Sequence, residues 1–290
     1  MKTAIESLIA AVVVGTLRRT PLSIAGPLSR FYARLVDTAI PRLRRVAYRN
    51  LAMALPASDP KTVTDGVFRS IARLLLAFAR LPDINATNVH EWIRYEGLDH
   101  FVKARDRRQG VLVATAHLGN WELSAYAHAL MTAPMNVVVR PLDNPAIDSL
   151  VEERRTLSGN RIIRKKEAAR AILRALSDGE AVGILVDQNA SLEEGVFVPF
   201  FGRLACANAA FTKFAHRSGA GVVPGFALWS EAERKYILRF YPEVPMTGDV
   251  QKDTAALHAF LEGVIREYPD QWLWIHRRWK TRPPGEEPLY

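Results

Sequence analysis

The stretch VLVATAHLGNWE, residues 111–122, indicates both the fold and the candidate site. Residues 111–116 form a short apolar run with β-branched side chains, which predicts a buried strand. Asn120 is a good N-cap for the helix predicted next, and Gly119 permits a tight turn before it. In an open α/β sheet, ligands bind at the carboxyl ends of the strands. His117 therefore leaves the strand at the edge where a site is expected.

The rest of the chain alternates short apolar runs with longer amphipathic ones. This pattern predicts an α/β fold with a mostly parallel central sheet flanked by helices. Further strands are predicted at residues 136–139, 181–186, 222–228 and 236–241. Helices are predicted at residues 61–80, 121–131, 145–158, 167–177, 207–218 and 254–268.

The positive charge of the chain is concentrated at its N-terminus. The 290 residues include 39 Lys or Arg and 30 Asp or Glu, a formal net charge of +9. Residues 1–50 carry nine basic and two acidic groups, so they hold seven of these net charges. Residues 8–17, LIAAVVVGTL, are apolar but too short to span a bilayer. We expect residues 1–56 to form a basic, membrane-associating helical segment and residues 57–290 to form the domain that carries the chemistry.

Two alternatives to membrane contact stay open for the basic N-terminus. An ordinary amphipathic helix can pack on the protein's own core and leave an arginine face in water. A nucleic-acid-binding surface is the second, and the sequence favours it less. The basic residues accompany long aliphatic side chains, whereas nucleic-acid surfaces interleave them with stacking aromatics.

His117 and Glu122 are the first candidates for catalysis. A carboxylate bonded to one imidazole nitrogen fixes the tautomer and makes the other nitrogen a better base. The two side chains can meet if His117 lies in the turn and Glu122 in the first turn of the helix. A histidine that merely caps a turn is the alternative. The chain contains no G-x-S-x-G nucleophile motif and no Walker P-loop, which argues against hydrolase and nucleotide-binding folds.

The cysteine and histidine content predicts no metal site. Cys206 is the single cysteine, so the chain cannot build an internal disulfide or a zinc site from several thiolates. The other histidines show no metal-ligand spacing. Cys206 is expected to be a small buried residue rather than a nucleophile.

Six blocks of the sequence together resemble the late acyltransferases of lipid A biosynthesis, which are related more distantly to the glycerolipid acyltransferases. HLGNWE matches the H-x₄-E motif of that family, and the other blocks follow in the family's order. The blocks are RRVAYRNLAMALP (44–56), HLGNWE (117–122), RPLDNPAID (140–148), VDQN (186–189), GVFVPFFG (195–202) and WIHRRWKTRP (274–283).

The resemblance implies transfer of a fatty acyl group from a thioester to a hydroxyl of a lipid A-type glycolipid. Acyl carrier protein is the expected donor and partner, and coenzyme A is the alternative donor. The resemblance also implies a place at the cytoplasmic face of the inner membrane, contact with anionic lipids, and no cofactor besides the thioester co-substrate. His117 would be the general base, and Glu122 would orient the imidazole. The expected substrate-binding residues are Asn120, Arg140, Arg164, Asp187 and Gln188.

Individual roles follow from this assignment. Arg140 and Arg164 are expected to hold phosphate, and Asn120 to donate to an oxyanion or an acceptor oxygen. Asp187 and Gln188 end a predicted strand at the same sheet edge as His117 and are expected to shape the site. Aromatic residues are expected either to line an acyl groove or to belong to the core; they are Trp121, Phe197, Phe200 and Phe201.

Other functions remain open at the level of sequence. An acyltransferase for another phospholipid or glycolipid would carry the same H-x₄-E motif. A membrane-bound lipid-binding protein without turnover is a second alternative, although the intact pair His117 and Glu122 argues against it. A nucleic-acid-binding module has only the basic charge in its favour, so nucleic acid is not expected as a partner.

Overall fold

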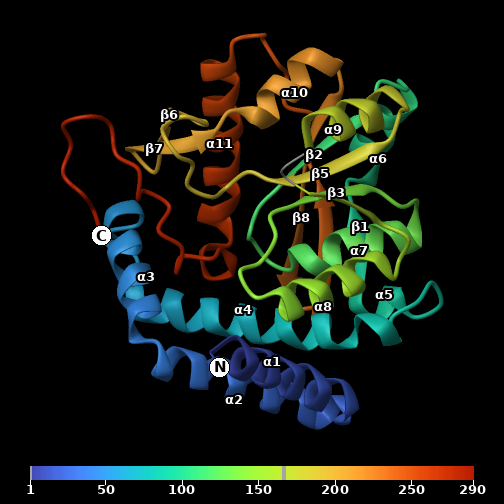
Figure 1. Ribbon diagram of the computed structural model, residues 1–290, viewed down its shortest axis with the longest axis vertical. Helices are drawn as coiled ribbons and strands as arrows, with labels where there is room; N and C mark the ends of the chain where they lie inside the picture. Colours follow the sequence, from blue (N-terminus) through green and yellow to red (C-terminus); the bar gives the residue numbers. More distant parts are fainter. Residues whose placement is uncertain (1, 165–167) are drawn as a thin grey trace.

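The computed structural model describes residues 2–164 and 168–290 and contains a seven-stranded sheet between layers of helices (Figure 1). The strand order is β1-β9-β8-β2-β5-β3-β4, and every pairing is parallel except that of β8 with β9. This confirms the predicted α/β class. The strands are β1 (Ile93–Glu96), β2 (Val111–Thr115), β3 (Asn136–Val139), β4 (Arg161–Arg164), β5 (Ala181–Leu185), β8 (Gly221–Ser230) and β9 (Lys235–Phe240).

Side chains that alternate along β2 point into two separate cores, because successive residues of a strand face opposite sides of the sheet. Leu112 and Ala114 belong to the core packed by α9, α10 and α11, whereas Val111 and Val113 belong to the core packed by α6 and α7. The helices are α4 (Pro60–Arg80), α5 (Val89–Trp92), α6 (Leu98–Asp106), α7 (Trp121–Met131), α8 (Pro145–Thr156), α9 (Ala168–Ser177), α10 (Ala210–Ser218) and α11 (Val250–Glu267), with 3₁₀ turns η1 (Leu81–Asp83) and η3 (Pro269–Gln271).

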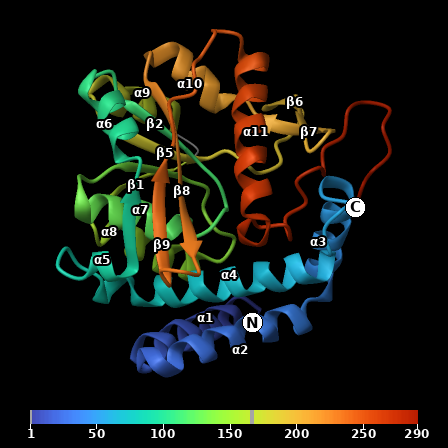
Figure 2. The same cartoon turned by 180° about the vertical axis from the view of Figure 1, so that it is seen from behind.

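Three helices precede this body: α1 (Lys2–Arg19), α2 (Leu22–Ala39) and α3 (Pro41–Ala54). Figures 1 and 2 show α1 and α2 on the far side of α4 from the sheet. Val14 and Leu17 are buried in the same core cluster as Phe78 of α4, so part of this segment packs on the protein's own core. Among the described residues, no helix has the combined length and apolar character needed to cross a membrane.

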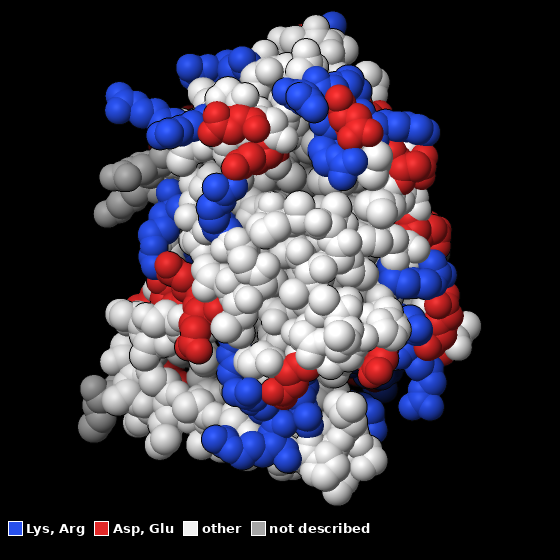
Figure 3. Space-filling view, turned by 90° about the vertical axis from the view of Figure 1, so that its right-hand side faces the viewer, with Lys and Arg blue, Asp and Glu red and all other residues white. Residues whose placement is uncertain are grey.

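Exposed apolar side chains are numerous on α1 and α2 and at Ile40, the residue after α2. We call this set the outer apolar face. Exposed apolar side chains are normally scattered singly, and a concentration of them in one segment is typical of an interaction surface. The face consists of Ile5, Leu8, Ile9, Val12, Leu22, Ile24, Phe31, Leu35, Val36 and Ile40. Elsewhere, the view in Figure 3 shows basic and acidic side chains next to one another around an uncharged centre.

One predicted helix begins too early. Ala207 and Asn208 were expected to open the helix 207–218, but they complete β7 (Arg203–Asn208), which pairs antiparallel with β6 (Gly195–Phe200). Cross-strand pairing to Val196 and Gly195 overrides the helical preference of an alanine-rich run. The side chain of Asn208 then accepts a hydrogen bond from the backbone N–H of Ala210, at the start of α10.

The short elements were not predicted individually. β1 and β4 are four residues each and lie at the two edges of the sheet, where half-exposed polar residues blur the apolar pattern. The helix predicted at 167–177 is α9, observed from Ala168, and residue 167 lies outside the described residues. The last helix begins at Val250 rather than at residue 254, because Asp249 caps it.

Candidate active site

The parallel register of two strands brings His117 and Asp187 together. Thr115 of β2 pairs with Leu185 of β5, and each functional residue follows two positions later. The carboxyl ends of neighbouring parallel strands meet at one sheet edge, which is the preferred position of ligand sites in such folds. The predicted shared edge of these residues is therefore confirmed.

Asp187 is the hydrogen-bond partner of the His117 imidazole. The distance from His117 Nδ1 to Asp187 Oδ1 is 2.9 Å. The backbone N–H of His117 and the indole Nε1 of Trp272 each donate to Asp187 Oδ2, both at 2.9 Å. Only 3% of the Asp187 side chain is exposed, so three donors satisfy a carboxylate that water hardly reaches.

These contacts shift both titrations in favour of the ion pair. Burial opposes ionisation of Asp187, but His117 and the hydrogen bonds outweigh it and hold the pKa of Asp187 well below its usual range. Burial likewise lowers the pKa of His117, but the charge and hydrogen bond of Asp187 outweigh it and raise that pKa overall. Since Asp187 accepts a hydrogen bond from Nδ1, the neutral imidazole carries its lone pair on Nε2.

Nε2 of His117 faces the outer side of the site. The exposed Gln188 places its Nε2 atom 3.3 Å from His117 Nε2, where an amide N–H can donate to the imidazole lone pair. The ring of Trp121 packs edge-on against the imidazole, with centroids 4.9 Å apart. Gln188 therefore occupies the hydrogen-bonding position at the second nitrogen of the imidazole.

The expected hydrogen bond between Glu122 and the imidazole is absent. Glu122 instead accepts two hydrogen bonds from Arg155, at 2.8 and 2.5 Å, and one from Trp121 Nε1, at 3.1 Å. Within the described residues, no ion pair shorter than 4.0 Å joins Glu122 to His117. Asp187 already occupies Nδ1, and α8 supplies a cation to Glu122. The Glu122 charge still contributes to the raised pKa of His117.

Asn120 is the N-cap of α7, as predicted. Its Oδ1 atom accepts from the backbone N–H of Leu123 at 3.0 Å. The whole side chain is buried, so it offers no surface from which to donate to a substrate. The expected oxyanion or acceptor contact of Asn120 stays a prediction, and the contact that the structure shows is the cap of the helix.

The turn at Gly119 requires glycine. Its φ is +66°, and an added Cβ would lie 2.0 Å from the carbonyl oxygen of Ala227. The neighbouring N–H of Asn120 donates to that same carbonyl at 2.9 Å, and the N–H of Gly119 donates to Gln271 O at 2.9 Å. The turn is thus held between β8 and the segment after α11.

Known proteins share this sequence along nearly all of its length. The profile of the family described as bacterial lipid A biosynthesis acyltransferase matches residues 1–281. The chain belongs to this family. A lipid A biosynthesis palmitoleoyltransferase of Escherichia coli (strain K12) is 30% identical over 266 residues, covering 89% of this chain and 86% of that protein. The protein is therefore an acyltransferase.

Two further relatives differ in the names of their products or acceptors. A lipid A biosynthesis lauroyltransferase of Escherichia coli (strain K12) is 28% identical over 255 residues, 86% of this chain and 83% of that protein. A phosphatidylinositol mannoside acyltransferase of Mycolicibacterium smegmatis (strain ATCC 700084 / mc(2)155) is 26% identical over 239 residues, 80% of this chain and 78% of that protein.

The two arginines of this acyltransferase that are expected to bind phosphate have different surroundings. Arg140 directly follows β3 and is exposed at the carboxyl edge of the sheet. Arg164, at the end of β4, forms ion pairs with Asp148 at 3.3 Å and with Glu152 of α8. Binding phosphate would require Arg164 to exchange these carboxylates, so the structure favours Arg140. The pairing of Arg164 with α8 was not visible in the sequence.

Arg155 and Trp272 were missed as site residues. Arg155 had no signal beyond its place on a helix, because its partner Glu122 lies on a different helix. Trp272 lies in the C-terminal stretch, where an isolated β-bridge to Leu118 brings it to Asp187. Only the tertiary packing identifies these partners.

The aromatic residues divide between site and core. Phe200 and Phe201 are buried and stack with Trp272, Trp274 and Trp279, so they are core rather than an acyl groove. Cys206 is buried as expected, and burial raises the pKa of its thiol, which makes it a poor nucleophile.

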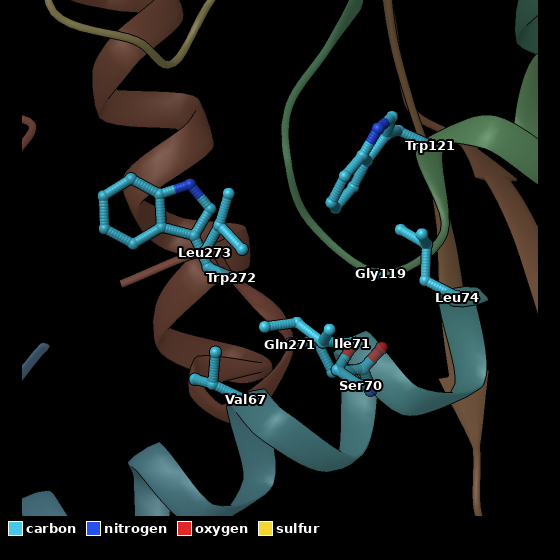
Figure 4. Close-up of a pocket in the computed structure, with 9 residues that line it drawn as sticks. All are labelled: Val67, Ser70, Ile71, Leu74, Gly119, Trp121, Gln271, Trp272 and Leu273. Carbon is cyan, nitrogen blue, oxygen red and sulfur yellow. The ribbon is translucent and has the colours of Figure 1, made fainter. Parts of the chain in front are cut away.

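Trp121 instead lines a narrow cavity beside the His117 turn. Figure 4 shows this cavity between α4, the turn at Gly119 and the segment at Gln271–Leu273. Its walls are mostly apolar, and Trp121, one of the lining residues, also contacts the imidazole of His117. The lining residues are Val67, Ser70, Ile71, Leu74, Gly119, Trp121, Gln271, Trp272 and Leu273.

Gly119→Ala should lower stability more than Gly219→Ala. Both glycines have positive φ, and a non-glycine residue there costs about 1–3 kcal/mol. Nothing lies within 4 Å of a Cβ added at Gly219, whereas at Gly119 it would strike Ala227 O. The free energies of unfolding from urea titration test this. Equal losses would contradict the close approach described for the turn.

Proposed function

We propose that this acyltransferase moves a fatty acyl group from a thioester, that of acyl carrier protein in the first instance, to a hydroxyl of a lipid A precursor. His117 is the general base in this proposal, and Asp187 is its partner. The observation that carries it is the buried Asp187 carboxylate on Nδ1, which leaves the basic Nε2 directed outward. The names of the relatives support lipid A as the acceptor.

The reaction needs one base and no covalent acyl-enzyme. Nε2 of His117 takes the proton of the acceptor hydroxyl as its oxygen attacks the thioester carbonyl. Asp187 stabilises the imidazolium that forms. The tetrahedral intermediate then expels the thiolate, which receives the proton from the imidazolium. The thioester already has a good leaving group, so neither Cys206 nor a cofactor takes part.

Glu122 acts in this proposal through charge and through Arg155. Its carboxylate accepts three hydrogen bonds from Arg155 and Trp121, so the Glu122–Arg155 pair fixes the Trp121 ring beside the imidazole. Its negative charge also favours the imidazolium formed during turnover. Glu122 thus supports the base without contacting Nδ1.

Arg140 is our candidate ligand for an acceptor phosphate. It is exposed at the same edge as His117, and its loop is tied to α1. The side chain of Asn144 donates to Thr3 O at 2.9 Å and accepts from Ser7 Oγ at 3.1 Å. An acceptor drawn from a membrane on the α1 side would therefore reach Arg140 at the sheet edge that also carries the base, two strands away from it. We propose peripheral association with the cytoplasmic face of the inner membrane through the outer apolar face and the arginines of α1 and α2.

A second acceptor class has one observation in its favour. A relative that matches 80% of this chain bears the name phosphatidylinositol mannoside acyltransferase. A phosphorylated glycolipid other than lipid A would satisfy the same base and the same Arg140. Transfer of a labelled acyl chain to both purified acceptors, from carrier protein and from coenzyme A, separates these choices.

His117→Asn should lower acyl transfer by ~10²–10⁴-fold, the usual range for loss of a general base. The asparagine amide can keep the hydrogen bond to Asp187, whereas His117→Ala would leave a buried carboxylate without its partner. Cys206→Ala is the control and should retain full turnover. Labelled acyl transfer, with a melting curve for each variant, is the measurement. Near wild-type turnover in a folded His117→Asn protein would refute this mechanism.

The pH profile of kcat/KM should have an acid limb above pH ~6.5, the ordinary histidine pKa. Only neutral His117 can accept a proton, and its pKa is raised, so activity rises as the pH increases through that pKa. Asp187→Asn removes the charge that raises it and should move the limb to lower pH while reducing the rate. A limb that stays in place would show that Asp187 is not the partner of the base.

Ile9→Glu and Phe31→Glu should each weaken binding to phosphatidylglycerol vesicles. These side chains are 57% and 53% exposed on the outer apolar face, whereas Leu192, at 54%, lies elsewhere. Leu192→Glu is the matched control and should bind as the wild type does. Deletion of residues 1–26 is less informative, because it removes the buried Leu17 from the core. Vesicle flotation at low and high salt measures the effect, and unchanged binding would place the contact on another face.

A further inference from the structure

The C-terminal segment of residues 271–276 begins at the last residue of η3 and forms one wall of the catalytic pair. Residues 272–290, all within the described part, form no helix or strand. The segment nevertheless contacts both halves of the site. The N–H of Leu273 donates to His117 O at 3.0 Å, and Trp272 donates to Asp187 at 2.9 Å. His276 Nε2 accepts the N–H of Asn189, two residues beyond Asp187, at 3.2 Å.

One side chain of α3 is hydrogen-bonded to two backbone carbonyl groups of this segment. Asn50 is fully buried, and its Nδ2 donates to the carbonyl oxygens of Trp274 at 2.7 Å and His276 at 2.8 Å. Its Oδ1 accepts a hydrogen bond from the hydroxyl of Tyr290. Both amide hydrogens of Asn50 are thus bonded to carbonyl groups that lie two residues apart in this segment.

We propose that Asn50 is a positioning residue for the His117–Asp187 pair and acts through the segment 271–276. The inference rests on the proposed function, in which that pair carries the reaction. A segment without a strand ladder owes its place to individual contacts, and Asn50 is fixed to it by two hydrogen bonds. Loss of these bonds leaves two carbonyls without their donor and lets Trp272 and Leu273 shift against the site.

Asn50→Asp is the sharpest variant. It keeps the shape and the acceptor for Tyr290, but it replaces the donor with an oxygen that faces two carbonyl oxygens. Asn50→Ala removes the donor without adding charge and provides the test if the first variant does not fold. Tyr290→Phe removes only the contact to Oδ1. Leu51→Ala destabilises the next buried position of α3 and leaves the two carbonyls tethered.

The assay measures kcat and KM across pH, at a temperature where each melting curve shows folded protein. For the Asn50 variants we expect kcat to fall by ~10–100-fold, as for a catalytic group misplaced by about 1 Å, with KM within about threefold. We also expect the acid limb to move to lower pH, because His117 loses the close contact with Asp187. Loss of folded protein alone would lower the activity by the same factor at every pH and would leave the acid limb in place. Tyr290→Phe and Leu51→Ala should keep the wild-type limb.

The outcomes separate this inference from the proposed function. Asn50 variants with the wild-type kcat and limb, or with the same profile as Leu51→Ala, overturn it. So does failure of both Asn50 variants to fold, since the residue would then serve the whole fold. His117→Asn is measured in parallel. If it stays active, the proposed mechanism fails, whereas its inactivity beside active Asn50 variants overturns the inference alone.

Discussion

The hydrogen-bonded contact between His117 and the buried Asp187 is the constraint on which the site depends. A carboxylate removed from water destabilises the protein unless charge and hydrogen bonds compensate it. Here the imidazole, the backbone N–H of His117 and the indole of Trp272 supply that compensation. The β2–β5 register must therefore be correct, because a shift by one residue would separate the carboxylate from two of its three donors.

The third donor explains why the C-terminus belongs to the site. Trp272 comes from a stretch without helix or strand, which the aromatic cluster behind it and Asn50 beside it hold in place. Packing of large rings excludes water from the back of Asp187, which strengthens its interaction with the imidazolium. The contacts that hold the pair thus involve segments from both ends of the chain. The residues that hold the His117–Asp187 pair are therefore far apart in the sequence.

Local patterns predicted what local physics determines. The β-branched runs of β2, β3 and β5 and the cap at Asn120 are properties of neighbouring residues, and their prediction was confirmed. The hydrogen-bond partner of His117 was not predicted correctly, because Glu122 is the carboxylate nearer to it in the sequence. Whether Glu122 or Asp187 binds Nδ1 depends on the strand register and on a cation from α8, Arg155, and neither is encoded in a spacing. The helix predicted at Ala207 was wrong for the same reason, because pairing with a cross-strand partner overrides the helical preference of this residue.

The N-terminal helices combine packing on the core, one of the alternatives that the sequence left open, with exposed apolar side chains. Val14 and Leu17 pack on α4 as an ordinary amphipathic helix would, while Ile9 and Phe31 point outward from α1 and α2. The core does not use these exposed side chains, which supports the proposed membrane contact. Asn144 ties α1 to the loop after Arg140, which lies at the same sheet edge as His117. If the outer apolar face lies on a bilayer, as proposed, a phosphorylated lipid would meet Arg140 without leaving the membrane surface, and only its hydroxyl would need to reach His117.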